Sequence, residues 1–248
     1  MDKDKDKDKD TAAGADKMPA ARPIIIAIDG PAGSGKSTLA ARLARRYGYV
    51  NIESGAMYRA LALQAILGGV SLDDSAALGA LARQSRIEIR PHREGNQVLI
   101  DGNDVTERIR HQDVTEAASK VSVHPPVREW MVKRQQEMGA AGGIVMEGRD
   151  IGTKVFPHAE VKIFLDAAPE VRGARRFLQA PGAITKEAAV LAELRTRDER
   201  DRTRANSPLV PAPDALTIDS TSLTLEEVVS RVQEIVDAKL AGRFIAGK

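Results

Sequence analysis

The sequence predicts an α/β protein whose core is a parallel β-sheet flanked by helices. Short apolar runs alternate along the chain with segments of helical periodicity, as in sheets whose strands are joined by helices. The first of these runs leads directly into a glycine-rich turn and then into a helical pattern. The chain has 248 residues, which suits one core with insertions better than two full domains.

The first predicted strand covers residues 24–28, a continuous β-branched run typical of a strand covered on both faces. Residues 1–22 precede it and are expected to form a disordered tail, because they alternate Asp and Lys at 2–10 and then turn to Thr, Ala and Gly. A helix is predicted at 37–47, because Leu39 and Leu43 recur at helical spacing and a glycine follows the segment. Further strands are predicted at 49–52, 144–146, 161–165 and 216–218, and further helices at 56–67 and 128–138.

Residues 84–108 have a different pattern and are predicted to form a small antiparallel insertion. Segments 87–90 and 97–100 are short strands separated by turn-forming residues, and a third segment follows at 103–105. The closing segment 225–240 places its apolar residues on one face, which predicts an amphipathic helix that docks on the core. Residues 241–248 are then a C-terminal tail.

The composition excludes several classes of protein. Lys and Arg total 37 against 35 Asp and Glu, so the net charge of +2 does not call for nucleic acid or a membrane as partner. There is no cysteine, which excludes disulfides and thiolate metal sites. We find neither a secretory signal nor an apolar run long enough to cross a membrane. We therefore expect a cytoplasmic protein that binds small molecules, with a monomer as the default state.

A phosphate-binding loop follows the first predicted strand. Residues 30–37 match the pattern G-x-x-x-x-G-K-[ST] between a strand and a helix, the context that this motif requires. Its glycines let backbone N–H groups turn toward phosphate oxygens, and the helix N-terminus adds partial positive charge. Lys36 is predicted to hold the β- and γ-phosphates of ATP, and Ser37 to be a ligand of Mg²⁺. The predicted ATP-binding residues are Gly30, Pro31, Ala32, Gly33, Ser34, Gly35, Lys36, Ser37 and Thr38.

The loop alone does not identify the phosphate acceptor, and a kinase, a guanine-nucleotide switch and a motor must be separated. The base-reading N-K-x-D pattern of a switch is absent. The second half of the chain is rich in arginine, whose planar guanidinium suits it to clamping phosphate groups. Polar segments also follow two predicted strands, at 53–59 and 147–152, where open α/β sheets bind ligands. These features favour a small-molecule kinase.

Five ordered motifs resemble those of bacterial cytidylate kinases, a family of nucleoside monophosphate kinases with a P-loop NTPase-type core. They are IDGPAGSGKS at 28–37, SGAMYR at 54–59, GRDIGT at 148–153, VFP at 155–157 and RDERDR at 197–202. The resemblance implies a kinase domain at 23–240, with the β insertion in its monophosphate-binding part and a mobile lid at about 168–185. It also implies ATP-dependent phosphorylation of CMP, and of dCMP, to the diphosphate with release of ADP.

The resemblance assigns roles around CMP. Ser119, Arg128 and Asp150 would contact cytosine. The ribose would be held by Ser54 and Asp201, with Arg197 nearby. The α-phosphate would be clamped by Arg59, Arg149 and Arg204, and Tyr58 would line the same crevice. The lid would offer Arg172, Arg175 or Arg176 to the transferring phosphoryl group.

The expected chemistry needs no general base, because the acceptor is itself an ionised phosphate. The sequence agrees with this, since none of its four histidines has a catalytic spacing. Catalysis is then positioning and charge neutralisation by arginines and Mg²⁺. Cytosine offers an amino donor at N4, whereas uracil would leave Asp150 facing an oxygen. A kinase acting on another monophosphate and a non-enzymatic nucleotide-binding module remain as alternatives. The residues expected to carry catalysis are Lys36, Arg149, Arg175, Arg176 and Arg200.

Overall fold

The structure, a computed structural model, describes residues 23–92, 95–178 and 187–242. The predicted tail at 1–22, residues 243–248 of the predicted C-terminal tail and residues 179–185 of the predicted lid lie outside these ranges. Within them, no helix has the length and the apolar composition that crossing a membrane requires.

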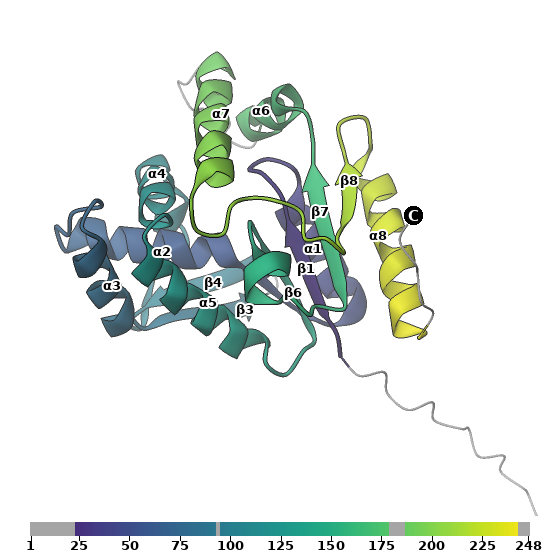
Figure 1. Cartoon of the computed structure of the whole chain (residues 1–248), viewed down its shortest axis with the longest axis horizontal. Helices are drawn as coiled ribbons and strands as arrows, with labels where there is room; N and C mark the ends of the chain where they lie inside the picture. The colour runs from purple at the N-terminus through teal and green to yellow at the C-terminus, as the bar shows by residue number, and fades with distance from the viewer. Residues whose placement is uncertain (1–22, 93–94, 179–186, 243–248) are drawn as a thin grey trace, which may run out of the picture.

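The core is a parallel sheet of five strands in the order β2-β6-β1-β7-β8, which confirms the predicted fold class (Figure 1). β1 is the middle strand because it buries apolar side chains on both faces: Ile26 and Ile28 lie in one apolar cluster and Ala27 in another. The strands are β1 (Ile25–Asp29), β2 (Val50–Glu53), β6 (Ile144–Gly148), β7 (Val161–Asp166) and β8 (Leu216–Asp219).

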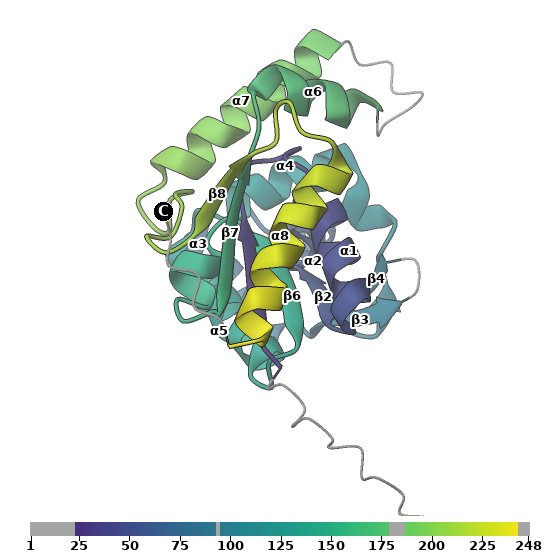
Figure 2. The same ribbon diagram turned by 90° about the vertical axis from the view of Figure 1, so that its right-hand side faces the viewer.

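Helices cover both faces of this sheet. α1 (Lys36–Tyr47) and α8 (Leu225–Leu240) lie on one face, where Leu39 and Val232 belong to the same buried cluster (Figure 2). α8 begins with a capping box, in which the Thr224 side chain and Glu227 satisfy each other's backbone N–H groups. On the opposite face, α5 (Pro125–Gly139) and a single π-helical turn, Ile151–Val155, pack with Ala27.

A second large apolar cluster lies beside the sheet. It joins α2 (Ser54–Leu67), α3 (Ser75–Gln84), α4 (Gln112–Val121) and a small antiparallel sheet. That sheet has the order β3-β4-β5, with β3 (Ile87–His92), β4 (Gly95–Ile100) and β5 (Asn103–Asp104), and it confirms the predicted antiparallel insertion. The Asn96 side chain of β4 donates to the carbonyl oxygen of Asn51 at 2.9 Å, which ties the insertion to β2.

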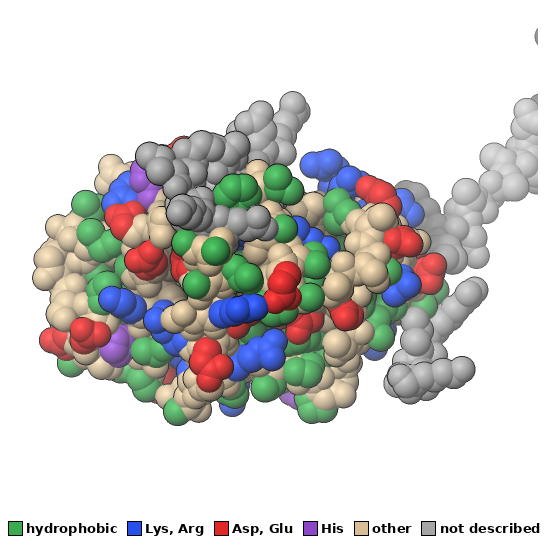
Figure 3. All heavy atoms as spheres, turned by 90° about the horizontal axis from the view of Figure 1, so that it is seen from above, with side chains coloured by type: hydrophobic (Ala, Val, Ile, Leu, Met, Phe, Trp, Pro, Cys, Tyr) green, Lys and Arg blue, Asp and Glu red, His purple; other side chains and the backbone are tan. Residues whose placement is uncertain are grey.

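Two further helices, α6 (Pro169–Leu178) and α7 (Glu187–Thr203), lie across the carboxyl ends of the strands (Figures 1 and 2). α6 follows β7 and includes most of the described residues of the predicted lid. Seen from this end, acidic and basic side chains are interspersed over the described surface (Figure 3). The two helices therefore cover the edge of the sheet where the polar motifs emerge.

Candidate functional site

The polar motifs that follow β1, β2 and β6 meet at one edge of the sheet. In the strand register Asp29 lies opposite Gly148, and Glu53 lies opposite Glu147. Because parallel strands end at the same edge, the phosphate-binding loop after β1 lies next to the polar turn after β6. Segments that are more than a hundred residues apart in the sequence therefore form one site.

Two glycines hold the phosphate-binding loop tightly against its neighbours. Gly30 has a φ of 149°, and a Cβ at this position would lie 2.0 Å from the carbonyl oxygen of Leu165. Gly33 has a φ of 76°, and its Cβ would lie 2.9 Å from the carbonyl oxygen of Arg172. Both positions therefore require glycine. The loop pattern predicted this for Gly30, whereas Gly33 stands at one of its variable positions.

Lys36, the first residue of α1, is buried at the centre of the loop. Its Nζ donates to the carbonyl oxygen of Pro31 at 2.6 Å, and the residue is 6% exposed. Burial and the charge of Arg149 lower the pKa of Lys36 well below its ordinary value. An anion bound next to Nζ would relieve this crowding of positive charge, so the surroundings of Lys36 favour a phosphate ligand.

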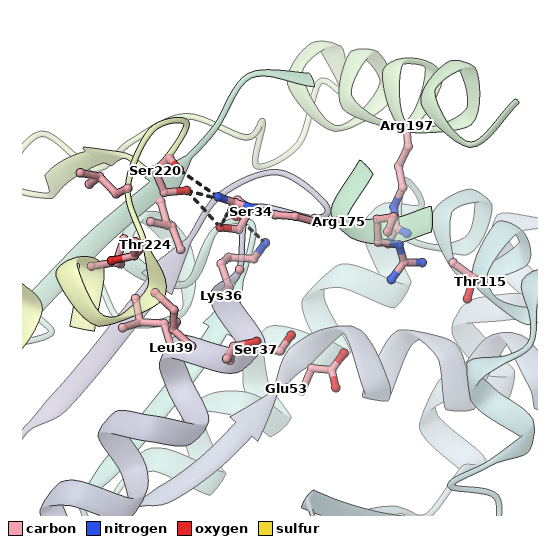
Figure 4. A pocket seen from close by; sticks show the side chains of 18 of the residues that line it. Ser34, Lys36, Ser37, Leu39, Glu53, Thr115, Arg175, Arg197, Ser220 and Thr224 are labelled. Atoms are coloured by element: carbon pink, nitrogen blue, oxygen red, sulfur yellow. Dashed lines mark hydrogen bonds between the residues drawn. The ribbon is translucent and has the colours of Figure 1, made fainter. Parts of the chain in front are cut away.

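A cavity of about 760 Å³ lies over the loop. Ser220 and Thr224, in the connection between β8 and α8, lie on one side, and Thr115 of α4 and Arg197 of α7 lie on the other (Figure 4). Lys36 lies between the two sides (Figure 4). Residues 33–38 line this cavity, while the other predicted ATP-binding residues, 30–32, lie outside its lining.

Two carboxylates, Glu53 and Glu147, lie at the ends of neighbouring strands near Ser37. Burial and the charge of Glu53 raise the pKa of Glu147 to about 7, although Ser37 hydrogen-bonds to it. In the described part of the chain, Oε1 of Glu147 is buried without a hydrogen-bond partner. Two crowded carboxylates and a hydroxyl are hard oxygen ligands that fit a divalent cation. No three acidic or histidine residues of the described ranges could hold a metal by themselves, so nucleotide phosphates would have to complete such a site.

A second, smaller cavity of about 60 Å³ lies among α2, α4, α7 and the turn after β6. All the predicted CMP-binding residues except Arg59 line it, and Arg59 lines the larger cavity. Arg197 lines both cavities, and its buried Nε has no hydrogen-bond partner among the described residues. Burial and the charge of Arg149 lower the pKa of Arg197 to about 10. Arg197 therefore lies where the two cavities meet, with a buried Nε that could donate to an anion.

Apart from Arg197, the charged side chains of the smaller cavity are paired with one another. Arg128 hydrogen-bonds to Asp150, and Nε of Arg149 donates to Asp201 at 2.8 Å. Arg204 lies 3.8 Å from Asp150 and 3.7 Å from Asp201. Burial opposes ionisation of Asp201, but the charges of Arg149 and Arg197 hold its pKa below the usual range. The cavity thus presents oriented donors and acceptors in a desolvated setting, which is what recognition of a base and a sugar requires.

Three further predicted residues have defined contacts. The Tyr58 ring centre lies 5.8 Å from the guanidinium carbon of Arg128, and burial raises the pKa of Tyr58 to about 12, so its hydroxyl is neutral. Ser54 Oγ donates to the carbonyl oxygen of Glu147 at 2.7 Å. Arg200 donates to Ser119 Oγ at 2.6 Å and lines neither cavity. The sequence predicted a direct catalytic contact for Arg200, whereas in the structure its side chain holds Ser119.

Asp29, to which the sequence assigned no role, connects the two halves of the site. Its carboxylate accepts hydrogen bonds from the backbone nitrogen atoms of Ile151 at 2.8 Å and Gly152 at 2.7 Å. Burial raises the pKa of Asp29 to about 6, although these two hydrogen bonds oppose the shift. The bonds fix the start of the π-helical turn, and so they fix Asp150 just before it.

The three candidate lid arginines differ in their contacts. Arg172 is 1% exposed, donates to the carbonyl oxygen of Ala32 at 3.0 Å and pairs with Asp198 at 2.6 Å. It therefore links the phosphate-binding loop to α7 and does not line either cavity. Arg175 lines the larger cavity but donates to the backbone oxygen of Ser220 at 2.9 Å, whereas Arg176 lines the cavity without a hydrogen bond or ion pair to a described residue.

The sequence analysis missed two parts of the larger cavity. One is the connection after β8, whose lining residues are Ser220, Leu223, Thr224, Leu225 and Val228. These residues follow the end of β8, as the polar segments at 53–59 and 147–152 follow the ends of β2 and β6. Their position after a strand is therefore the signal that could have predicted them. The other part is formed by Arg110 and Thr115, near an α4 helix that was not predicted.

Comparisons with known proteins bear on the acceptor. A model of the family described as cytidylate kinase matches residues 26–238. The chain belongs to the cytidylate kinase family. It is 50% identical over 221 residues to the cytidylate kinase of Geobacillus kaustophilus, which covers 88% of this chain and 99% of that protein. It is 46% identical over 222 residues to the cytidylate kinase of Pasteurella multocida, which covers 87% of this chain and 98% of that protein.

Cytidylate kinase membership confirms the predicted phosphotransferase class, with a phosphate group as acceptor, and the predicted phosphorylation of CMP. A kinase of this family uses ATP, typically with a divalent metal. Among solved structures, the shikimate kinase of Bacteroides thetaiotaomicron aligns with a TM-score of 0.45 and 14% identity over 86% of this chain and 98% of that one.

Proposed function

We propose that this cytidylate kinase transfers the γ-phosphoryl group of Mg²⁺-ATP to CMP or dCMP, with the two cavities as donor and acceptor sites. One observation carries the assignment. The larger cavity contains the phosphate-binding loop, the smaller contains the Arg128–Asp150 pair, and Arg197 lines both. A phosphoryl group that passes between two nucleotides has to cross where their sites join, and a guanidinium at that place neutralises its charge.

The donor triphosphate lies along the loop and Lys36 in this proposal. The apolar end of the same cavity, formed by Leu223, Leu225 and Val228, would accept the base of ATP. Arg175 lies between the loop and this end, because it donates to backbone oxygens of both Ser34, at 3.4 Å, and Ser220, at 2.9 Å. In this proposal Arg176, and not Arg175, lies next to the transferring phosphoryl group.

The acceptor base lies among Ser119, Arg128 and Asp150. Asp150 already accepts a hydrogen bond from Arg128 and lies 3.8 Å from Arg204, so its position and charge are fixed before a base arrives. A carboxylate can accept from the N4 amino group of cytosine, whereas the O4 of uracil would face it without a proton. The unpaired buried oxygens disfavour uracil, and this gives the site its selectivity.

Phosphoryl transfer forms a bond from an oxygen of the CMP phosphate to the γ-phosphorus and breaks the bond from that phosphorus to the bridging oxygen of ADP. Lys36, Arg176 and Arg197 would neutralise charge during this exchange, while Arg149 and Arg204 orient the acceptor phosphate. Ser37, Glu53 and Glu147 would hold Mg²⁺ together with the ATP phosphates, and the ion would supply further charge neutralisation. Use of ATP agrees with the cytoplasmic location that the sequence predicts.

The test is direct detection of CDP by ion-exchange chromatography after incubation of the protein with ATP, Mg²⁺ and CMP. We expect CDP and ADP in equal amounts, no CDP when the divalent metal is chelated, and no CDP from Lys36→Met. ATP binding without CDP formation would favour a binding module, and CDP formation in the absence of a divalent metal would contradict the proposed Mg²⁺ site.

A further inference from the structure

A short 3₁₀ turn, Arg108–Arg110, follows the antiparallel insertion and leads into α4. Its middle residue, Ile109, is 2% exposed and packs in the apolar cluster formed by α2, α4 and the antiparallel sheet. Successive side chains of a 3₁₀ helix are about 120° apart, because the helix has three residues per turn. The buried Ile109 therefore directs the two flanking arginines to different sides.

The two arginines have different surroundings. Both terminal nitrogens of Arg108 bond to Asp113 on the surface, at 2.8 and 2.6 Å. Arg110 instead lines the larger cavity together with Lys36 and Arg59. Among the described residues its guanidinium has neither a hydrogen bond nor an ion pair. An arginine in a phosphate cavity with all its donors available is a binding group for an anion.

The lining of the larger cavity places Arg110 toward the acceptor. Glu53 and Arg59 line this cavity together with Arg110. Glu53 ends β2, and its carboxylate already pairs with Arg59 at 2.8 Å. Arg110 therefore shares a cavity with Arg59, a residue expected to clamp the acceptor phosphate, and Thr115 of the adjoining helix lines the same cavity (Figure 4).

We propose that Arg110 binds the phosphate group of the acceptor nucleotide. This inference rests on the proposed function and adds a residue to it from outside the family motifs described above. A planar guanidinium with five donors can make two hydrogen bonds to one phosphate, and Arg110 would add them to the donors that Arg59 keeps beside its single bond to Glu53. The turn that follows the antiparallel insertion then contributes a substrate contact directly, in addition to packing beside the site.

The test compares the binding of CMP and cytidine by titration calorimetry in the absence of ATP. The variants are Arg110→Gln and, as the matched control from the same turn, Arg108→Gln. We expect Arg110→Gln to weaken CMP binding by about 10- to 100-fold, the range for loss of a charge-assisted hydrogen bond, and to leave cytidine binding unchanged. Arg108→Gln should leave both affinities within twofold. In steady-state kinetics, Arg110→Gln should raise the KM for CMP and leave the KM for ATP within about twofold.

Three results would overturn the inference: unchanged CMP affinity in Arg110→Gln, equal weakening of CMP and cytidine, or a rise in the KM for ATP alone, which would place Arg110 on the donor phosphates. Because Arg110 is exposed, thermal unfolding should match that of the wild type and so verify the fold. Failure of the wild-type protein to bind CMP at all would remove the proposed function together with this inference, and is distinguishable from failure of Arg110 alone.

Discussion

Replacement of Glu147 by glutamine should stabilise the protein free of ligand and impair its activity. The carboxyl group is buried beside Glu53, and burial with this neighbouring charge raises its pKa from 4.5 to about 7. The folded state therefore binds this proton more tightly than the unfolded state, and stability falls as the pH rises from about 4.5 to about 7. At about 1.4 kcal/mol per pKa unit, the charged carboxylate costs about 3 kcal/mol above pH 7. A glutamine that leaves one buried donor unsatisfied loses about 1–3 kcal/mol of this, so the net gain is at most about 2 kcal/mol.

The assay is urea unfolding at pH 8 and at pH 4.5, with Glu137→Gln as a control that removes an exposed carboxylate paired with Arg134. Glu147→Gln should raise the free energy of unfolding at pH 8 and lose that advantage at pH 4.5, while the control changes little at either pH. Mg²⁺-ATP should stabilise the wild type more than Glu147→Gln, because the cation site is weakened. A difference between the variant and the wild type that does not change with pH, or a loss of stability at pH 8, would refute the reasoning.

Further predictions concern the loop, the base and the buried pair. In steady-state kinetics, Lys36→Ala should lower kcat at least 100-fold with every acceptor. Asp150→Ala should raise the KM for CMP at least tenfold and leave the affinity for ATP, measured by calorimetry, unchanged. Equal effects of the two variants would contradict the division into donor and acceptor sites. Gly33→Ala should weaken ATP binding at least tenfold, because its Cβ would meet the carbonyl oxygen of Arg172 and the residue has a φ of 76°. Asp198→Asn should destabilise the fold by about 1.5–3 kcal/mol in urea unfolding, because it removes the nearer of the two carboxylates that pair with Arg172 and leaves Asp166 at 4.0 Å. A loss below about 1 kcal/mol would show that the Arg172–Asp198 pair does not join the loop to α7.

The elements with strong local patterns could be predicted from the sequence. The apolar run of β1, the glycines of the loop and the one-sided apolar face of α8 are local signals, and the structure confirms all three elements. The antiparallel insertion was also predicted because its short strands are separated by turn-forming residues.

The roles that the sequence did not predict depend on contacts between segments that are distant along the chain. Asp29 is an ordinary strand end in the sequence, and only the fold shows that it holds the backbone of Ile151 and Gly152. Arg172 and Arg176 are one turn apart on the same face of α6, so the sequence does not distinguish them. Only the fold shows that Asp198 of α7 pairs with Arg172, while Arg176 lines a cavity. Arg110 has no strand-end signal, since its direction depends on the burial of Ile109.

The central claim is that the smaller cavity reads cytosine while the larger holds ATP. The most direct test is a coupled assay of ADP formation from ATP and Mg²⁺ with CMP, dCMP, UMP, AMP and GMP as separate acceptors, for the wild type and Asp150→Ala. We predict a rate confined to CMP and dCMP in the wild type, and a loss of the preference for CMP over UMP in the variant. A wild-type rate that is highest with UMP or a purine nucleotide, or a variant that keeps full selectivity, would contradict the assignment of the acceptor site.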